Sequence, residues 1–123
     1  MTNNPIGWFE TYVQDMERAR KFYESVLQVK LETMGNGDPE MLVFPGDPHK
    51  PGATGALVKM EGFPSGGNST LIYFMCDDCA VEASRVVPSG GRIQREKMSI
   101  GEYGFIALVV DTEGNMFGLH SMK

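Results

Sequence analysis

The chain opens with alternating apolar and polar residues and continues with apolar residues at helical spacing. Residues 6–13 are predicted to form a strand with Trp8, Glu10 and Tyr12 on one face, because side chains alternate along extended backbone. Asp15 then suits a helix N-cap. Apolar residues at spacings of three and four predict one buried stripe on that helix: Met16, Ala19, Phe22, Tyr23, Val26 and Leu27.

Three more strands are predicted in the first half of the chain. Apolar runs at 29–34 and 40–44 are separated by the turn sequence 35–39, which contains glycine and proline. A third run, 53–60, follows the proline-rich loop 45–52. The first half is therefore predicted to contain a strand, a helix and three strands, in that order.

The second half repeats this order after the glycine-rich segment 62–68. A strand at 70–76 leads into a helix that is capped by Asp77 or Asp78 and runs to about Val87. Three more strands are expected after that helix: 92–98, 105–110 and 116–120.

The repeated order predicts the fold class. The two strand-to-helix junctions lie about 63 residues apart, as duplication of one unit would give. A unit of that size is too small to bury a core alone, so the two units must pack together. We predict a single α+β domain of two βαβββ modules, about 5–61 and 69–122, joined by the linker 62–68 and forming a curved sheet around a cleft.

The last two predicted strands form a hairpin around the turn sequence 111–115. Gly114 suits a positive φ angle, and the carboxylates of Asp111 and Glu113 can accept hydrogen bonds from loop amides. One face of the returning strand, expected to point into the cleft, carries three residues: Met116, Gly118 and His120.

Composition excludes some classes of function. With a net charge of −5, the 123-residue chain has no clustered Lys and Arg for binding nucleic acid. It has no apolar run long enough to span a membrane, and its first five residues do not resemble a secretion signal. We expect a cytoplasmic protein with a small neutral or cationic ligand.

Cys76 and Cys79 form a C-x-x-C pair, a spacing that occurs in redox sites and in half of some zinc sites. A structural zinc site needs four ligands, and the chain has no second pair of cysteines. We expect the pair to pack at the end of a strand and in the first turn of a helix, with redox chemistry as the alternative.

The two modules, the opening segment 6–23 and the closing segment 111–119 together resemble the vicinal oxygen chelate superfamily of glyoxalases, bleomycin-resistance proteins and extradiol dioxygenases. The resemblance covers essentially the whole chain and implies the tandem βαβββ fold. It does not select a function, because the superfamily contains isomerases, lyases, dioxygenases, thiol transferases and metal-free drug binders.

The resemblance also implies where a metal would be held. Enzymes of the superfamily usually bind one divalent metal through side chains from four strands. Three of these positions fall on Trp8, Leu71 and Gly118, and the fourth lies within 53–60, where no His, Asp or Glu occurs. None of these residues offers a carboxylate or imidazole. We therefore expect no metal at the usual place, and apolar ligand contacts instead.

Glu10 and His120 each lie two residues beyond one of these positions and are the candidate acid and base. They could equally be structural polar groups that satisfy each other. Glu102 and Tyr103 lie in a glycine-flanked loop that is either a lid or a plain turn. The expected ligand-binding set also includes four further residues: Tyr12, Tyr73, Met75 and Met116.

Three functions remain open, and we favour the first. The protein is a metal-free binder of a small, partly apolar molecule; or a lyase, isomerase or dioxygenase-related enzyme that uses Glu10 and His120 or a divalent metal at a displaced site; or a redox module at Cys76 and Cys79. Open sheet edges and the superfamily's habit of dimerising imply a homodimer.

Overall fold

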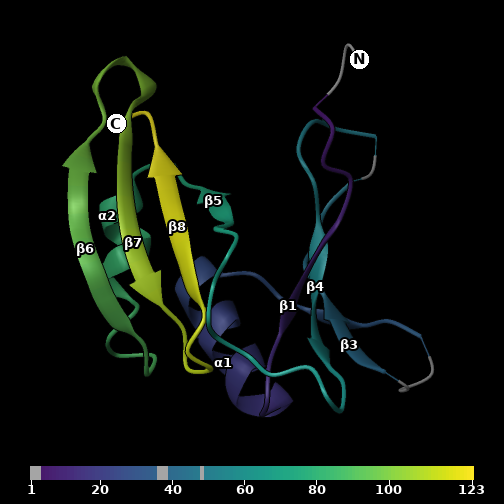
Figure 1. Ribbon diagram of the computed structural model, residues 1–123. Coiled ribbons are helices and arrows are strands. Elements are labelled where there is room, and N and C mark those ends of the chain that lie inside the picture. The colour runs from purple at the N-terminus through teal and green to yellow at the C-terminus, as the bar shows by residue number, and fades with distance from the viewer. Residues whose placement is uncertain (1–3, 36–38, 48) are drawn as a thin grey trace.

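Two four-stranded sheets, one from each half of the chain, lie on either side of the first helix (Figure 1). The computed structural model describes residues 4–35, 39–47 and 49–123. The first half contains β1 (Phe9–Tyr12), α1 (Met16–Leu27), β2 (Glu32–Thr33), β3 (Glu40–Val43) and β4 (Gly55–Lys59). The second half contains β5 (Tyr73–Met75), α2 (Cys79–Ser84), β6 (Arg92–Ser99), the 3-10 turn η1 (Gly101–Tyr103), β7 (Phe105–Val110) and β8 (Met116–Ser121).

The two sheets have the same topology. Their strand orders are β1-β4-β3-β2 and β5-β8-β7-β6, and in each sheet the first strand runs parallel to the last strand of its module. The other neighbours are antiparallel. The predicted α+β fold with two βαβββ modules is therefore confirmed, although the curved sheet is divided into two separate sheets.

Several predicted boundaries were wrong. The strand predicted at 29–34 is only β2, because this edge strand pairs with β3 alone, through Glu32 and Thr33. The helix expected to reach Val87 ends at Ser84, since the following amides bond three residues back, as Val86 does to Ala83 at 3.1 Å. The predicted turn 35–39 and loop 45–52 each include positions outside the described residues.

Helix α1 forms as its sequence predicts. The Asp15 side chain caps the helix by accepting a 3.0 Å hydrogen bond from the Arg18 amide, and Gln28 ends it in the left-handed conformation with φ of 55°. The predicted apolar stripe is buried along its length except for Leu27, which is partly buried. No helix in the described ranges is long and apolar enough to cross a membrane.

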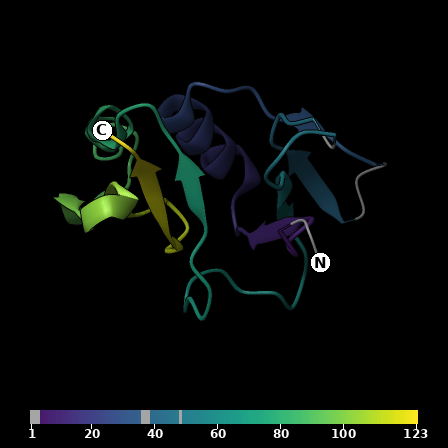
Figure 2. The ribbon, with the colours of Figure 1, turned by 90° about the horizontal axis from the view of Figure 1, so that it is seen from above.

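The core is shared between the modules. On α1, Phe22 lies edge-on to Phe117 of β8 at 6.1 Å, while Tyr23 packs against Phe44 of the first module at 5.6 Å. Phe74 of β5 completes this aromatic cluster at 5.4 Å from Phe44. Figure 2 shows α1 between the two sheets, with the connection from β4 to β5 passing on the opposite side of the molecule. Neither module therefore buries this core without the other.

Candidate functional site

A cavity of about 750 Å³ lies between the two modules and is called the inter-module pocket below. One wall comes from the segment before and at the start of β1, including Trp8, and from the loop that joins β3 to β4. The other wall comes from residues 70–75, in and before β5, and from Glu82 on α2. The pocket is therefore formed by segments far apart in the sequence, which the shared core holds together.

Most of the pocket surface is apolar and aromatic. Phe9, Phe44 and Phe74 contribute a rigid aromatic group, with ring centroids 5.4 to 6.2 Å apart. Trp8 and Leu71, at two of the implied metal positions, also line the pocket and are 39% and 38% exposed. Such a surface suits a flat or apolar molecule, because aromatic rings offer large contact area and preferred stacking geometry.

Gly118, at a third implied metal position, leaves room for an aromatic ring. The register pairs Gly118 with Tyr73, and a Cβ atom on Gly118 would lie 2.2 Å from the Tyr73 ring. Tyr73 therefore lies over β8 at this point and is itself part of the pocket lining. The absence of a side chain at Gly118 is explained by this close approach.

Metal donors are missing from the implied positions. Indole, isobutyl and hydrogen side chains at Trp8, Leu71 and Gly118 do not fit a divalent cation. Within 4–35, 39–47 and 49–123, no three His, Cys, Asp or Glu side chains gather in a way that could hold a metal.

Glu82 is the unexpected polar group of the inter-module pocket. Its Oε1 is buried and has no hydrogen-bond partner among the described residues. Burial, with smaller contributions from the charge of Glu82 and a hydrogen bond to it, raises the pKa of the Cys76 thiol to about 12. The thiol therefore stays protonated at neutral pH beside the carboxyl group.

Both cysteines are free, with Cys79 fully buried at the start of α2. The reactive form of a cysteine is the thiolate, and a pKa near 12 leaves Cys76 almost entirely as the thiol. This argues against the redox hypothesis. The expected packing at a strand end and in a first helical turn agrees with where the two side chains lie.

Glu10 lines a second, smaller cavity of about 400 Å³ beneath the connection from β4 to β5, together with Tyr12 and Met116. One Glu10 oxygen accepts from Trp8 Nε1 at 3.2 Å, and the other accepts from the Tyr12 hydroxyl at 2.9 Å. The hydrogen bond to Glu10 raises the pKa of Tyr12, with smaller contributions from burial and from the charge of Glu10. Glu10 is therefore bonded to residues of its own strand face.

His120 lies elsewhere, with Nε2 at 2.7 Å from the backbone carbonyl of Tyr103. Glu102 and Tyr103 are exposed in η1, and neither they nor His120 are among the residues that line the two cavities just described. Glu10 and His120 thus have separate partners among the described residues.

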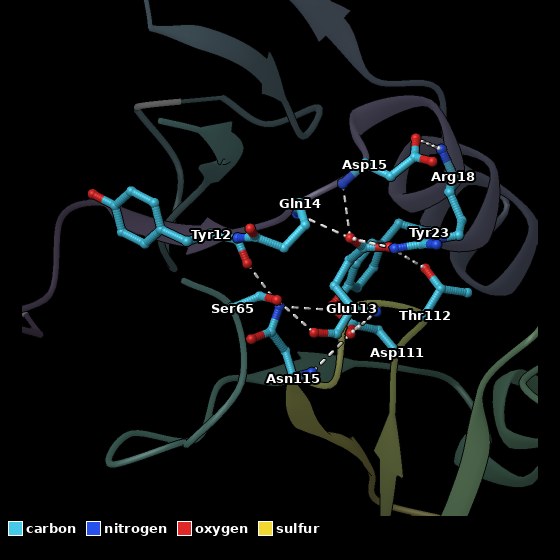
Figure 3. Close-up of polar contacts among 10 residues, drawn as sticks. All are labelled: Tyr12, Gln14, Asp15, Arg18, Tyr23, Ser65, Asp111, Thr112, Glu113 and Asn115. Atoms are coloured by element: carbon cyan, nitrogen blue, oxygen red, sulfur yellow. Dashed lines mark hydrogen bonds and ion pairs between the residues drawn. The ribbon is translucent and has the colours of Figure 1, made fainter. Parts of the chain in front are cut away.

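A second set of polar groups joins the modules and is called the polar junction below: the loop Asp111–Asn115 with its partners Tyr12, Gln14, Asp15, Arg18, Tyr23 and Ser65 (Figure 3). Glu113 accepts from the amides of Gln14 and Asp15 at 2.9 Å and from Arg18 Nε at 2.7 Å. Both of its oxygens are therefore bonded, and its side chain is fully buried.

The other residues of the polar junction are bonded equally well. Asp111 accepts from the amides of Glu113 and Asn115 at 2.8 Å and from the Tyr23 hydroxyl at 2.5 Å. Asn115 donates to the Tyr12 carbonyl at 2.9 Å, and its side-chain oxygen accepts from the Gly66 amide at 2.6 Å. The predicted bonding of Asp111 to loop amides is confirmed, while Glu113 bonds amides of the other module.

These contacts set the pKa values. Burial alone would raise the pKa of Glu113, but hydrogen bonds from Arg18, from the amides of Asp15 and Gln14 and from Thr112 outweigh it and lower the pKa to about 2. Burial raises the pKa of Asp111, and burial with the nearby Asp111 carboxylate raises that of Tyr23 well above its ordinary value. The polar junction is a structural connection whose acceptors are already occupied.

Sequence reasoning identified much of the pocket but missed Glu82. Trp8, Leu71, Tyr73 and Met75 all line the inter-module pocket, as expected from strand alternation. Glu82 follows Cys79 by three positions, on the side of α2 that also carries the buried Ala83. A charged residue beside a buried helical stripe is the signal that could have revealed it.

Comparisons with known proteins agree with this architecture. The model of the Glyoxalase/Bleomycin resistance protein/Dioxygenase superfamily matches residues 5–119. Glyoxalase I from Zea mays is similar, at 22% identity and TM-score 0.75, over 99% of this chain and 47% of that one. TnmS3, an antibiotic binding protein from Streptomyces sp. CB03234, is similar at 23% identity and TM-score 0.67, over 98% of both chains.

A glyoxalase/bleomycin resistance protein from Albidiferax ferrireducens is similar at 20% identity and TM-score 0.71, over 94% of this chain and 98% of that one. The chain spans about half the length of the maize enzyme. No curated protein matches the sequence. At these identities the structural comparisons establish the fold.

Proposed function

Because the chain belongs to the Glyoxalase/Bleomycin resistance protein/Dioxygenase superfamily, we propose that it binds a small, partly apolar molecule in the inter-module pocket, without a metal and without chemical turnover. A structural relative described as an antibiotic binding protein supports this class of function. A similar fold in a glyoxalase supports the competing class, a lyase or isomerase. The apolar and aromatic lining of the inter-module pocket favours binding over catalysis.

The observation that carries the proposal is the pocket itself. Its volume of about 750 Å³ falls in the range of roughly 300–1,000 Å³ that is typical for sites that hold drug-sized molecules. The aromatic group of Phe9, Phe44 and Phe74 gives the ligand a preformed surface. The positions that would hold a metal in related enzymes carry Trp8 and Leu71, which contact an apolar ligand instead.

Catalysis by Glu10 and His120 is less favoured. A general acid and base that act on one substrate must both reach it. Glu10 is bonded to Trp8 and Tyr12, whereas His120 contacts the Tyr103 carbonyl. Their separate partners favour structural roles for both.

A screen of small molecules by melting temperature tests the proposal. Ligands of the pocket should stabilise the protein by mass action and should still do so after treatment with a chelator. Leu71→Trp, which fills the pocket, should abolish the shift, and Val87→Trp, at a 61% exposed position outside the pocket lining, should preserve it. Binding that requires an added divalent cation, or conversion of a bound compound to product, would contradict the proposal.

We also propose a homodimer. The strand register aligns Met75, His120, Ile106 and Met98 in a row across all four strands of the second sheet. Met75 is 84% exposed and Met98 is 38% exposed, so apolar side chains at both ends of this row meet solvent in the single chain. A second copy of the chain would remove these side chains from water.

Light scattering at micromolar concentration tests the homodimer. The wild type should have the mass of two chains, and Met75→Glu should reduce it to one. Val81→Glu, at a 46% exposed position on α2, is the matched control and should leave the dimer intact. A monomeric wild type would refute this proposal.

A further inference from the structure

Glu82 brings a carboxyl group to a mostly apolar pocket, and its buried Oε1 has no donor among the described residues. A carboxyl group that lacks hydrogen bonds is unfavourable when it is removed from water, and a correctly placed donor offsets that cost. None of the described residues supplies that donor to Oε1. A molecule that enters the pocket with a donor at this end would therefore gain more than apolar contact.

The surroundings of Glu82 narrow the chemistry of that donor. The Cys76 thiol, a weak donor, neighbours the Glu82 carboxyl group and also lies 3.7 Å from the Phe74 carbonyl. The pocket lining also includes the apolar residues Phe74, Met75 and Leu27. In such surroundings a carboxylate selects a positively charged N–H group, because a charge-assisted hydrogen bond is about twice as strong as a neutral one.

Two other charged groups belong to the pocket lining. Asp47 and Lys50 line the pocket from the loop between β3 and β4, and both residues are exposed. Charges that remain in contact with water contribute little to selectivity compared with a buried one. Glu82, which is less exposed than Asp47 and Lys50, therefore determines which charge the pocket prefers.

Resting on the proposed function, we infer that Glu82 is the specificity-determining residue of the inter-module pocket and that the ligand is a flat, apolar molecule carrying a cationic nitrogen. The apolar body lies against Phe9, Phe44 and Phe74, and the cationic N–H group donates to the Glu82 carboxylate. No covalent step is involved.

Three acridines with the same ring system but different charge test this inference: 9-aminoacridine, which is cationic at neutral pH, acridine, which is largely neutral, and acridine-9-carboxylate. Trp8 is the only tryptophan of the chain and lines the pocket, so quenching of its fluorescence reports binding directly. The wild type should bind 9-aminoacridine about tenfold or more tightly than acridine, and the carboxylate most weakly.

Two variants assign the preference to Glu82. Glu82→Leu should reduce the preference for 9-aminoacridine over acridine to about twofold or less while acridine binding is retained, because the apolar surface is unchanged. Glu61→Gln, which removes an exposed carboxylate outside this pocket, should keep the wild-type preference. Melting curves of both variants establish that each is folded.

The acridine measurements distinguish the role of Glu82 from small-molecule binding in the pocket. Equal affinity of the wild type for all three acridines, or an unchanged preference in Glu82→Leu, overturns the role of Glu82 and leaves small-molecule binding intact. Failure of every acridine to bind overturns both claims for this class of flat apolar molecule. Tighter binding of the carboxylate would assign the charge preference to Lys50 rather than to Glu82.

Discussion

The two modules meet at two places that treat a buried carboxyl group in opposite ways. In the polar junction, Glu113 has both oxygens bonded to groups of the other module. In the inter-module pocket, Glu82 has one oxygen without a partner among the described residues. The comparison separates a carboxylate that holds the fold together from one that remains available to a ligand.

The largest effect is expected at the polar junction. Glu113→Gln replaces an acceptor with an amide group that faces the donors of Arg18, Gln14 and Asp15, so we expect the free energy of unfolding to fall by about 3 kcal/mol. Urea denaturation of the wild type and the variant measures it. The exposed Glu61→Gln should change the free energy of unfolding by less than about 0.5 kcal/mol. Equal losses in the two variants would mean that the Glu113 carboxylate does not hold the fold together.

The pH dependence of stability should report the same carboxylate. The pKa of Glu113 is lowered to about 2 in the folded protein, below its ordinary value of 4.5, so its stabilising contribution is complete above pH 4.5 and is lost as the pH falls toward 2. The stability difference between wild type and Glu113→Gln should therefore shrink over this range. A constant difference from pH 6 to pH 2 would contradict the assignment.

A smaller loss is expected from Tyr23→Phe, which removes the buried hydroxyl that donates to Asp111 at 2.5 Å. The ring contacts with Phe22 and Phe117 remain, so we expect a loss of about 1.5 kcal/mol. Thermal unfolding measures it. Tyr103→Phe, at a 69% exposed position, is the matched control and should have no measurable effect.

The smallest effect, and the opposite sign, is expected at the pocket. Glu82→Leu removes an oxygen without a partner and adds apolar surface, so stability should stay the same or rise by up to about 1 kcal/mol. The same urea experiment measures it. A loss as large as that of Glu113→Gln would mean that Glu82 is a structural group like Glu113.

Local pattern predicted those parts of the molecule that depend on neighbours in sequence. The stripe on α1, the face shared by Trp8, Glu10 and Tyr12 and the hairpin of β7 and β8 follow from helical and strand periodicity. The lengths of β2 and α2 do not follow from periodicity. β2 is short because it pairs with β3 alone, and α2 ends early because the amides that follow it bond to carbonyls three residues back.

The candidate site was predicted only in part, for a physical reason. Trp8, Leu71 and Tyr73 reach the pocket because alternation determines their face. Glu82 and the loop between β3 and β4 contribute through packing between distant segments, which periodicity does not describe. The different hydrogen-bond partners of Glu10 and His120 likewise depend on how the chain is packed.

The bonds from Gln14 and Asp15 to Glu113 also bear on how the protein is made. The amide of Asp15 finds its acceptor 98 positions further along the chain, so during synthesis this bond cannot form until Glu113 has left the ribosome. A nascent first module therefore emerges with an incomplete helix start and part of its aromatic core exposed to water. Packing of the two modules therefore waits for the closing segment.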